Sequence, residues 1–132
     1  MTKLKALFIL LLLTVKVAAL AEEPMLRATQ YAFVKASIGK GKPHFVEVGS
    51  ESCHSCQIMG KLLYKVDKKY PQYNIDFVDV KHERQAAYEL KIQMIPTQLI
   101  FDKKGKEVYR HVGPLGTQEL LDLFTTYKFD EE

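Results

Sequence analysis

The sequence predicts an α/β fold in which helices cover both faces of a central, mixed, four-stranded sheet. Two observations lead to this class. Short apolar runs of strand-like composition alternate with longer stretches of helical periodicity, which is the pattern of parallel crossovers. The last two strand-like runs instead flank Asp102-Lys103-Lys104-Gly105, which predicts an antiparallel hairpin. One sheet is therefore expected to contain both parallel and antiparallel pairs.

Each expected element rests on a local pattern. Pro24 suits the first turn of a helix, and Pro71 ends the long amphipathic helix that starts at the first cysteine. Gly105 provides the positive φ that the hairpin turn needs, and Thr117 is placed to cap the last helix. The expected elements are, in order, a helix over residues 25–38, a strand over 44–49, a helix over 53–70, a strand over 75–80, a short helix over 83–90, strands over 97–101 and 107–112, and a helix from 117, with residues 130–132 fraying.

The first 21 residues are expected to form a cleavable signal peptide rather than part of the fold. Lys3 and Lys5 provide a basic start, residues 6–15 are apolar, and Ala-Leu-Ala at 19–21 is a cleavage site. A membrane span needs about 20 apolar residues, so an uncleaved anchor is the less favoured alternative. The folded domain is then expected over residues 22–132, in an exported protein.

The charge of the chain gives no support for nucleic-acid binding. The formal net charge is +3, but three of the 19 basic residues lie in the expected leader, which has no acidic residue. Acidic and basic residues are therefore equal in number in the remaining domain, and no basic excess is left to attract nucleic acid. A domain of this length buries a core of its own, and we expect a monomer.

Both cysteines of the chain lie in one motif, Cys53-His54-Ser55-Cys56, at the expected start of the long helix. Thiols at this spacing close a small disulfide ring or bind a soft metal. Free backbone N–H groups and the helix dipole stabilise a thiolate there, and the thiolate is the reactive form of cysteine. A disulfide across so short a gap removes little loop entropy, so the pair suits redox chemistry better than structural cross-linking.

The order of elements, this C-x-x-C motif and Ile95-Pro96-Thr97 before the hairpin together resemble the thioredoxin family. More closely, they resemble the exported thioredoxin-like proteins of bacteria, and the resemblance covers residues 25–127. It implies a thioredoxin-like fold and a periplasmic thiol–disulfide oxidoreductase that acts on proteins with disulfides or thiols. Reduction is favoured over oxidation, with electrons from a membrane donor. No cofactor is expected beyond the redox disulfide of the two cysteines.

The resemblance also implies roles for single residues. Cys53 is the nucleophile, and Cys56 resolves the mixed disulfide. Glu47 matches a buried acid beneath the disulfide that accepts the proton of Cys56, unless strand alternation turns it outward. His54 and Ser55 fill the variable pair between the cysteines, where an imidazolium and a hydroxyl would tune the thiolate.

Ile95, Pro96 and Thr97 are the expected substrate-binding stretch. Pro96 matches the family's cis-proline, which leaves the backbone of Ile95 open to pair with a substrate. The alternative is that Pro96 only begins a strand, where proline is tolerated.

The sequence departs from the thioredoxin pattern at several positions. Ser52 replaces a tryptophan before the first cysteine, and Lys61 replaces a helix proline, with Gly60 beside it as a possible bend. Phe77 stands where a lysine pairs with the buried acid, and the N-terminal strand of the family is not recognisable. These departures concern the range of partners rather than the dithiol chemistry.

Two alternative functions stay open at this point. One is a dithiol oxidase of the same fold. The other is a copper or zinc carrier in which the cysteines supply two ligands, but the remaining histidines, His44, His82 and His111, are scattered along the chain. His111 is expected at an exposed edge position, so no metal site is predicted.

Overall fold

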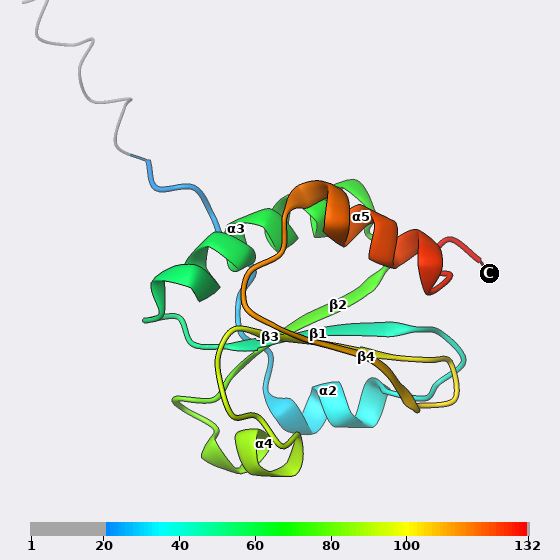
Figure 1. Cartoon of the computed structure of the whole chain (residues 1–132), viewed down its shortest axis with the longest axis horizontal. Helices are drawn as coiled ribbons and strands as arrows, with labels where there is room; N and C mark the ends of the chain where they lie inside the picture. Colours follow the sequence, from blue (N-terminus) through cyan, green and yellow to red (C-terminus); the bar gives the residue numbers. More distant parts are fainter. Residues whose placement is uncertain (1–20, 132) are drawn as a thin grey trace, which may run out of the picture.

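The computed structural model describes residues 21–131, which form one sheet with two helical layers (Figure 1). The predicted fold class is confirmed. The leader predicted for residues 1–21 lies outside the described residues, apart from Ala21. Across the described part of the chain, every helix is too short or too polar to span a membrane.

The sheet has the strand order β2-β1-β3-β4 and is mixed, as expected. The central strand β1 (His44–Gly49) pairs in parallel with β2 (Asn74–Asp79) and antiparallel with β3 (Thr97–Phe101). The edge strand β4 (Glu107–Val112) pairs antiparallel with β3. Gly105 has a φ of 89° in the turn between these two strands, which is the conformation predicted for it.

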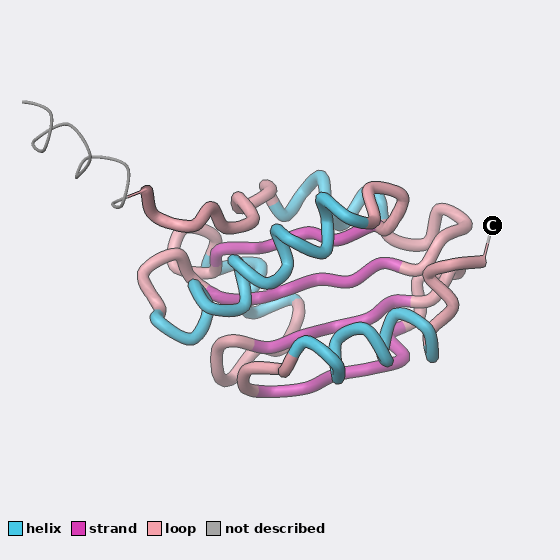
Figure 2. The backbone as a smooth tube through the Cα atoms, turned by 90° about the horizontal axis from the view of Figure 1, so that it is seen from above, coloured by secondary structure: helices cyan, strands magenta, loops and turns pink. Residues whose placement is uncertain are grey.

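Two helices cover each face of the sheet (Figures 1 and 2). One face is covered by α3 (His54–Lys69) and α5 (Thr117–Thr126). The other is covered by α2 (Tyr31–Ser37) and α4 (Arg84–Glu89). The strand–helix–strand order thus gives the layered architecture that the sequence predicts.

Alternation along the strands divides the core into two clusters. On β1, Phe45 belongs to the cluster under α3 and α5, whereas Val46 and Val48 belong to the cluster under α2 and α4. The first cluster also contains Met59, Leu63, Val66, Tyr73, Ile75, Ile100, Leu115, Leu120, Phe124 and Phe129, and the second contains Val34, Val78, Ala86, Leu90 and Leu99.

The N-terminal segment differs from the prediction, because residues 21–30 are not helical and the first helix begins at Tyr31. Backbone N–H groups of this segment bond to other elements: Leu26 donates to the carbonyl of Gly60 on α3, and Thr29 to that of Phe77 on β2. Ala28 makes one isolated parallel bridge with Phe77. Within the described residues, this single bridge stands in place of the N-terminal strand of the family. These tertiary bonds replace those of a local helix.

Gly60 lies where this segment crosses the helix. A Cβ at this position would lie 2.7 Å from Cε and 3.2 Å from Cβ of Met25, so a larger residue would force the Met25 side chain to move. The helix itself continues unbroken from His54 to Lys69. The bend considered at Gly60 stays a prediction.

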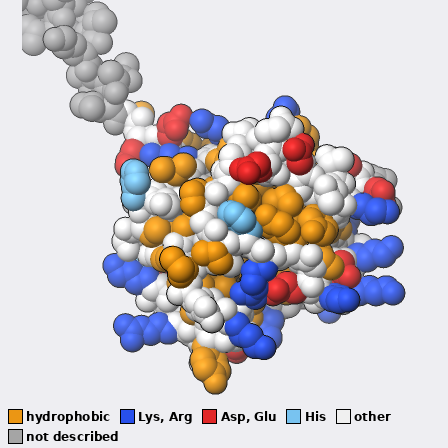
Figure 3. All heavy atoms as spheres, viewed as in Figure 1, with side chains coloured by type: hydrophobic (Ala, Val, Ile, Leu, Met, Phe, Trp, Pro, Cys, Tyr) orange, Lys and Arg blue, Asp and Glu red, His pale blue; other side chains and the backbone are white. Residues whose placement is uncertain are grey.

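The C-terminal part also differs in detail. Gly116 is the N-cap of α5, not Thr117, and its backbone N–H donates to the carboxylate of Glu119 at 2.8 Å. The chain end does not simply fray, because Phe129 is buried and the hydroxyl of Tyr73 donates to Asp130. In the space-filling view, lysine and arginine side chains gather at the end of the molecule that holds the β3–β4 turn and the C-terminus (Figure 3). The start of α3 lies at the opposite end.

Candidate active site

The two cysteines open helix α3 in the order that the sequence predicts. Cys53 is the N-cap, and its sulfur accepts a hydrogen bond from the backbone N–H of Cys56 at 3.4 Å. The backbone of Cys53 is held on both sides, by the carbonyl of Ser50 at 3.1 Å and by the N–H of Gln57 at 2.9 Å. Both cysteines are free thiols, Cys53 half-buried and Cys56 buried. Only the first sulfur is therefore open to a substrate.

Cys56 sits in a crowded, dry place beneath Cys53. A Cβ on Gly49 would lie 2.8 Å from the sulfur of Cys56 and 3.2 Å from the ring of Phe77, so the strand can approach the helix only with glycine at this position. Burial, followed by the hydrogen bond with Cys53, raises the pKa of Cys56 to about 12. Cys56 therefore stays a thiol and needs a base before it can attack.

Glu47 is the candidate for this base, because its charge acts on the pKa of Cys56. It lies on β1, is fully buried, and shares the α3-facing side of the strand with Phe45 and Gly49. The outward orientation considered from the sequence is therefore wrong. Burial raises the pKa of Glu47 to about 8, although hydrogen bonds from Gln98 act against this rise and the charge of Cys53 adds to it. A carboxyl group with this pKa exchanges its proton near neutral pH.

A polar row that sequence reasoning missed crosses the sheet from Glu47. Gln98 is fully buried on β3, and its Nε2 donates to both carboxylate oxygens of Glu47 at 3.2 Å. Its Oε1 lies 2.7 Å from Nδ1 of His111 on β4. His111 is half-buried, so its expected exposure at the edge is wrong. One feature of the sequence points to Gln98: like Glu47, it is a polar residue within an otherwise apolar strand.

The predicted substrate stretch lies at the same end of the sheet as the cysteines. The Ile95–Pro96 peptide bond is cis. Val48 pairs with Thr97 across β1 and β3, so Pro96 lies beside Gly49, the residue that touches Cys56. The hydroxyl of Thr97 donates to the carbonyl of Met94 at 2.6 Å, and Pro96 accepts from the N–H of Gly113 at 2.8 Å. Pro96 and Thr97 are buried, and Ile95 is partly exposed.

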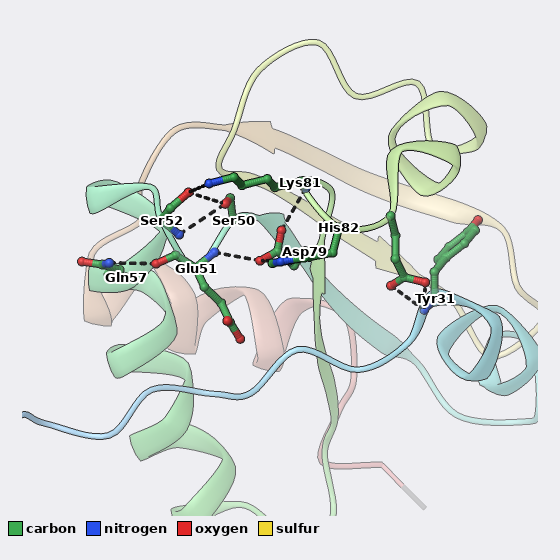
Figure 4. Close-up of polar contacts among 9 residues, drawn as sticks. Tyr31, Ser50, Glu51, Ser52, Gln57, Asp79, Lys81 and His82 are labelled. Atoms are coloured by element: carbon green, nitrogen blue, oxygen red, sulfur yellow. Dashed lines mark hydrogen bonds and ion pairs between the residues drawn. The ribbon is translucent and has the colours of Figure 1, made fainter.

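Ser50 and Ser52, which precede the cysteine motif, form a polar cluster with Lys81 (Figure 4). Ser52 stands where thioredoxin has a tryptophan. The hydroxyl of Ser52 lies 3.0 Å from that of Ser50 and accepts a hydrogen bond from Nζ of Lys81 at 3.2 Å. Asp79 orders this corner by accepting from the backbone N–H groups of Glu51 and Lys81. Of the two tuning residues, His54 is exposed and Ser55 is half-buried.

Residues 21–131 contain no group of three or more histidine, cysteine, aspartate or glutamate side chains arranged to hold a metal ion. The three histidines considered as ligands have different partners within this part of the chain. His44 pairs with Asp76 at 2.7 Å, and His82 pairs with Asp79 at 3.2 Å. His111 belongs to the polar row.

Comparison with known proteins places this geometry in a family. Residues 31–128 match the family model described as a thioredoxin-like domain, which is well over half of the chain. The chain belongs to the thioredoxin-like domain family. The family that the sequence resembles is thus confirmed.

The relatives agree with this assignment. The chain is 36% identical over 61 residues to an H-type thioredoxin of Picea mariana; the match covers 46% of this chain and about half, 48%, of that relative. It is 30% identical over 78 residues to thioredoxin-1 of Saccharomyces cerevisiae, covering 59% of this chain and 75% of the relative. The crystal structure of Fasciola hepatica thioredoxin superposes with a TM-score of 0.68 at 25% identity, covering 79% of this chain and 100% of that one. Family and fold support thiol–disulfide oxidoreductase activity.

Proposed function

We propose that the protein is an exported thiol–disulfide oxidoreductase that reduces disulfides of periplasmic proteins. One observation carries the proposal: a half-exposed cysteine caps a helix, a buried cysteine lies one turn below it, and a buried carboxyl group lies beneath both. Cys53 and Cys56 are the redox pair, and Glu47 is the proton acceptor. No further cofactor takes part.

In the first step, the thiolate of Cys53 attacks one sulfur of a substrate disulfide. A mixed disulfide forms, and the second substrate sulfur leaves as a thiolate that takes a proton from water. The N–H of Cys56 points at the sulfur of Cys53 and stabilises its negative charge before the attack. Ile95 and Thr97, on either side of the cis-proline Pro96, line the place where the substrate chain is held.

In the second step, Cys56 attacks the sulfur of Cys53. The thiol proton of Cys56 passes to the carboxylate of Glu47, the new Cys53–Cys56 disulfide forms, and the other substrate sulfur leaves as a thiolate. Two electrons have then moved from the dithiol to the substrate. This proton transfer is needed because the raised pKa of Cys56 keeps it a thiol, which is a poor nucleophile without a base.

The location and direction of the reaction rest on the sequence. The expected leader supports export, and the isoleucine before Pro96 together with Glu47 supports reduction over oxidation. A dithiol donor at the membrane must then reduce the disulfide again after each cycle. Expression of the full chain in a bacterium, followed by fractionation and intact mass, tests export and cleavage after Ala21.

Replacing each cysteine by serine tests the chemistry. Cys53→Ser should abolish reduction of a protein disulfide, because no nucleophile remains at the surface. Cys56→Ser should accumulate mixed disulfides with substrates, because the resolving thiol is missing. Both are measured by turnover with a dithiol donor and by mass spectrometry of trapped species.

A control is Ser37→Ala on α2, the helix that covers the opposite face of the sheet from the cysteines. It removes an exposed hydroxyl and should leave turnover unchanged. Equal, mild losses from both cysteine variants would contradict the assigned roles. Stoichiometric metal bound to protected thiols would favour the carrier instead.

A further inference from the structure

The polar row beneath the cysteines continues beyond Glu47 to the edge of the sheet. Strand register lines up Phe77, Glu47, Gln98 and His111 on β2, β1, β3 and β4, on the face that α3 covers. The row is apolar at the β2 end and polar toward β4, where the half-buried ring of His111 lies. Glu47 is therefore connected to the β4 edge by hydrogen bonds.

We propose that Gln98 and His111 are positioning residues that determine whether Glu47 is held as the carboxylate that receives the proton of Cys56. The inference rests on the proposed function, in which Glu47 is that acceptor. Neither residue touches the substrate or the sulfur atoms; both act through the orientation of one amide.

The hydrogen bonds in the row determine which groups donate and which accept. A carboxylate only accepts, so the contacts of Gln98 with both oxygens of Glu47 must come from the amide nitrogen. The amide oxygen then faces His111 and must accept, so Nδ1 of His111 carries the proton. In this arrangement every bond supports an ionised Glu47.

A second, complete arrangement fits the same space. The two ends of an amide are nearly equal in size, so a half-turn of the Gln98 amide brings its oxygen to Glu47 and its nitrogen to His111. Glu47 must then be protonated to donate, and His111 must be neutral with its proton on Nε2. Protonation of Glu47 and the tautomer of His111 are thus coupled through Gln98.

A charged imidazole can take part in only one of these arrangements. It donates from both nitrogens and has no lone pair to accept with, so it pairs only with the amide oxygen and holds the amide nitrogen toward Glu47. The groups that face Glu47 are Gln98 on β3, the two thiols on α3 and the apolar ring of Phe77 on β2. The ring of Tyr109 stacks near His111.

Two substitutions at one position separate this role from simple packing. His111→Asn keeps an N–H donor near the place of Nδ1, whereas His111→Leu fills the space without a donor. Without the donor, the amide is free to turn its oxygen toward Glu47, which favours the protonated acid. We expect the Glu47 pKa to rise by at least about half a unit in the leucine variant and to stay near the wild-type value in the asparagine variant.

The measurement is the ¹³C carboxyl shift of Glu47 against pH in the reduced protein, which needs no turnover. In parallel, the pH profile of mixed-disulfide resolution should move by the same amount, so resolution at pH 7 slows about threefold in His111→Leu only. Equal Glu47 titrations in the leucine and asparagine variants would overturn the proposal. Wild-type protein without thiol exchange would instead contradict the proposed function and leave the titration result standing.

A wild-type measurement guards against a variant that does not fold. At pH values above the Glu47 titration, ¹⁵N shifts should place the His111 proton on Nδ1, while the exposed His54 serves as the internal reference. A proton on Nε2 of His111 at that pH would refute the coupling without any substitution. Gln98→Leu, which removes the amide, should abolish the difference between the two His111 variants.

Discussion

The two faces of the one sheet bury polar side chains in different places. Under α2 and α4, Val46, Val48 and Leu99 form an apolar centre, and the buried polar side chains His44 and Thr97 each stand at the first residue of a strand. Under α3 and α5, the corresponding rows begin with Phe45 and Ile100 and then change, one residue pair further along, to Glu47 and Gln98. On this second face, the buried polar pair stands at the centre of the sheet and on the side that the cysteine-bearing helix covers.

This difference shows how a small core can contain an acid. Glu47 is buried next to a partner that is placed by strand register, so the energetic cost of burial is reduced and what remains appears as a raised pKa. At the centre of the opposite face, where Val46 pairs with Leu99, the same side chain would have no polar partner across the strand. Four substitutions, one of them also in a Cys56→Ala background, test this comparison.

The largest expected effect comes from moving an amide to the apolar face. Leu99→Gln should destabilise the protein by about 3 kcal/mol or more, since it buries an unpartnered amide and removes apolar burial. The matched change on the other face, Gln98→Leu, should cost only about 1 kcal/mol at pH 6, where Glu47 is protonated. Urea unfolding at pH 6 measures both, and equal costs would mean that the two faces do not differ.

A second effect is expected in the pH dependence of stability. The pKa of Glu47 rises from 4.5 to about 8 on folding, so the folded state binds the extra proton between these values. Stability is therefore fully present at low pH and is lost as pH rises toward 8, by at most about 1.4 kcal/mol per pH unit for one proton.

Glu47→Gln keeps the shape of the side chain but cannot ionise. We expect the loss of stability between pH 5 and 8 to flatten in this variant, and resolution of the mixed disulfide to slow near neutral pH. Denaturant midpoints across this pH range and the rate profile check both. A wild-type stability curve parallel to that of the variant would contradict a raised pKa.

The smallest effect concerns the room around Cys56. Alanine normally stabilises an extended position relative to glycine, but at Gly49 its Cβ would meet the sulfur of Cys56 at 2.8 Å. Gly49→Ala should therefore cost about 1–2 kcal/mol. In a Cys56→Ala background part of this cost should disappear, and a double-mutant cycle without coupling would show that the sulfur is not the obstacle.

Local patterns were sufficient for most of the fold. The amphipathic pattern of α3, the hairpin glycine and the apolar strands are signals carried by neighbouring residues, and the structure has these elements within a residue or two of their expected bounds. The inward side of Glu47 followed from the valines that flank it on a strand covered on both faces. The roles of Cys53, Cys56 and Pro96 came from the family resemblance and stay predictions.

What sequence reasoning missed depends on contacts between distant segments. Gln98 meets Glu47 on one side and His111 on the other only through the register of three strands, which no local pattern specifies. The helical periodicity before Tyr31 was overridden by backbone bonds to α3 and β2. Thr117 looked like a cap, but the carboxylate of Glu119 fixes the helix start one residue earlier.

The crossing of the N-terminal segment over α3 has a practical consequence. Through the backbone bonds of Leu26 and Thr29, this segment connects α3 to the edge strand β2. A shortened version of the protein that started after Thr29 would lose both bonds and expose Gly60 to water. Truncated samples for solution work should therefore keep residue 25 and everything after it.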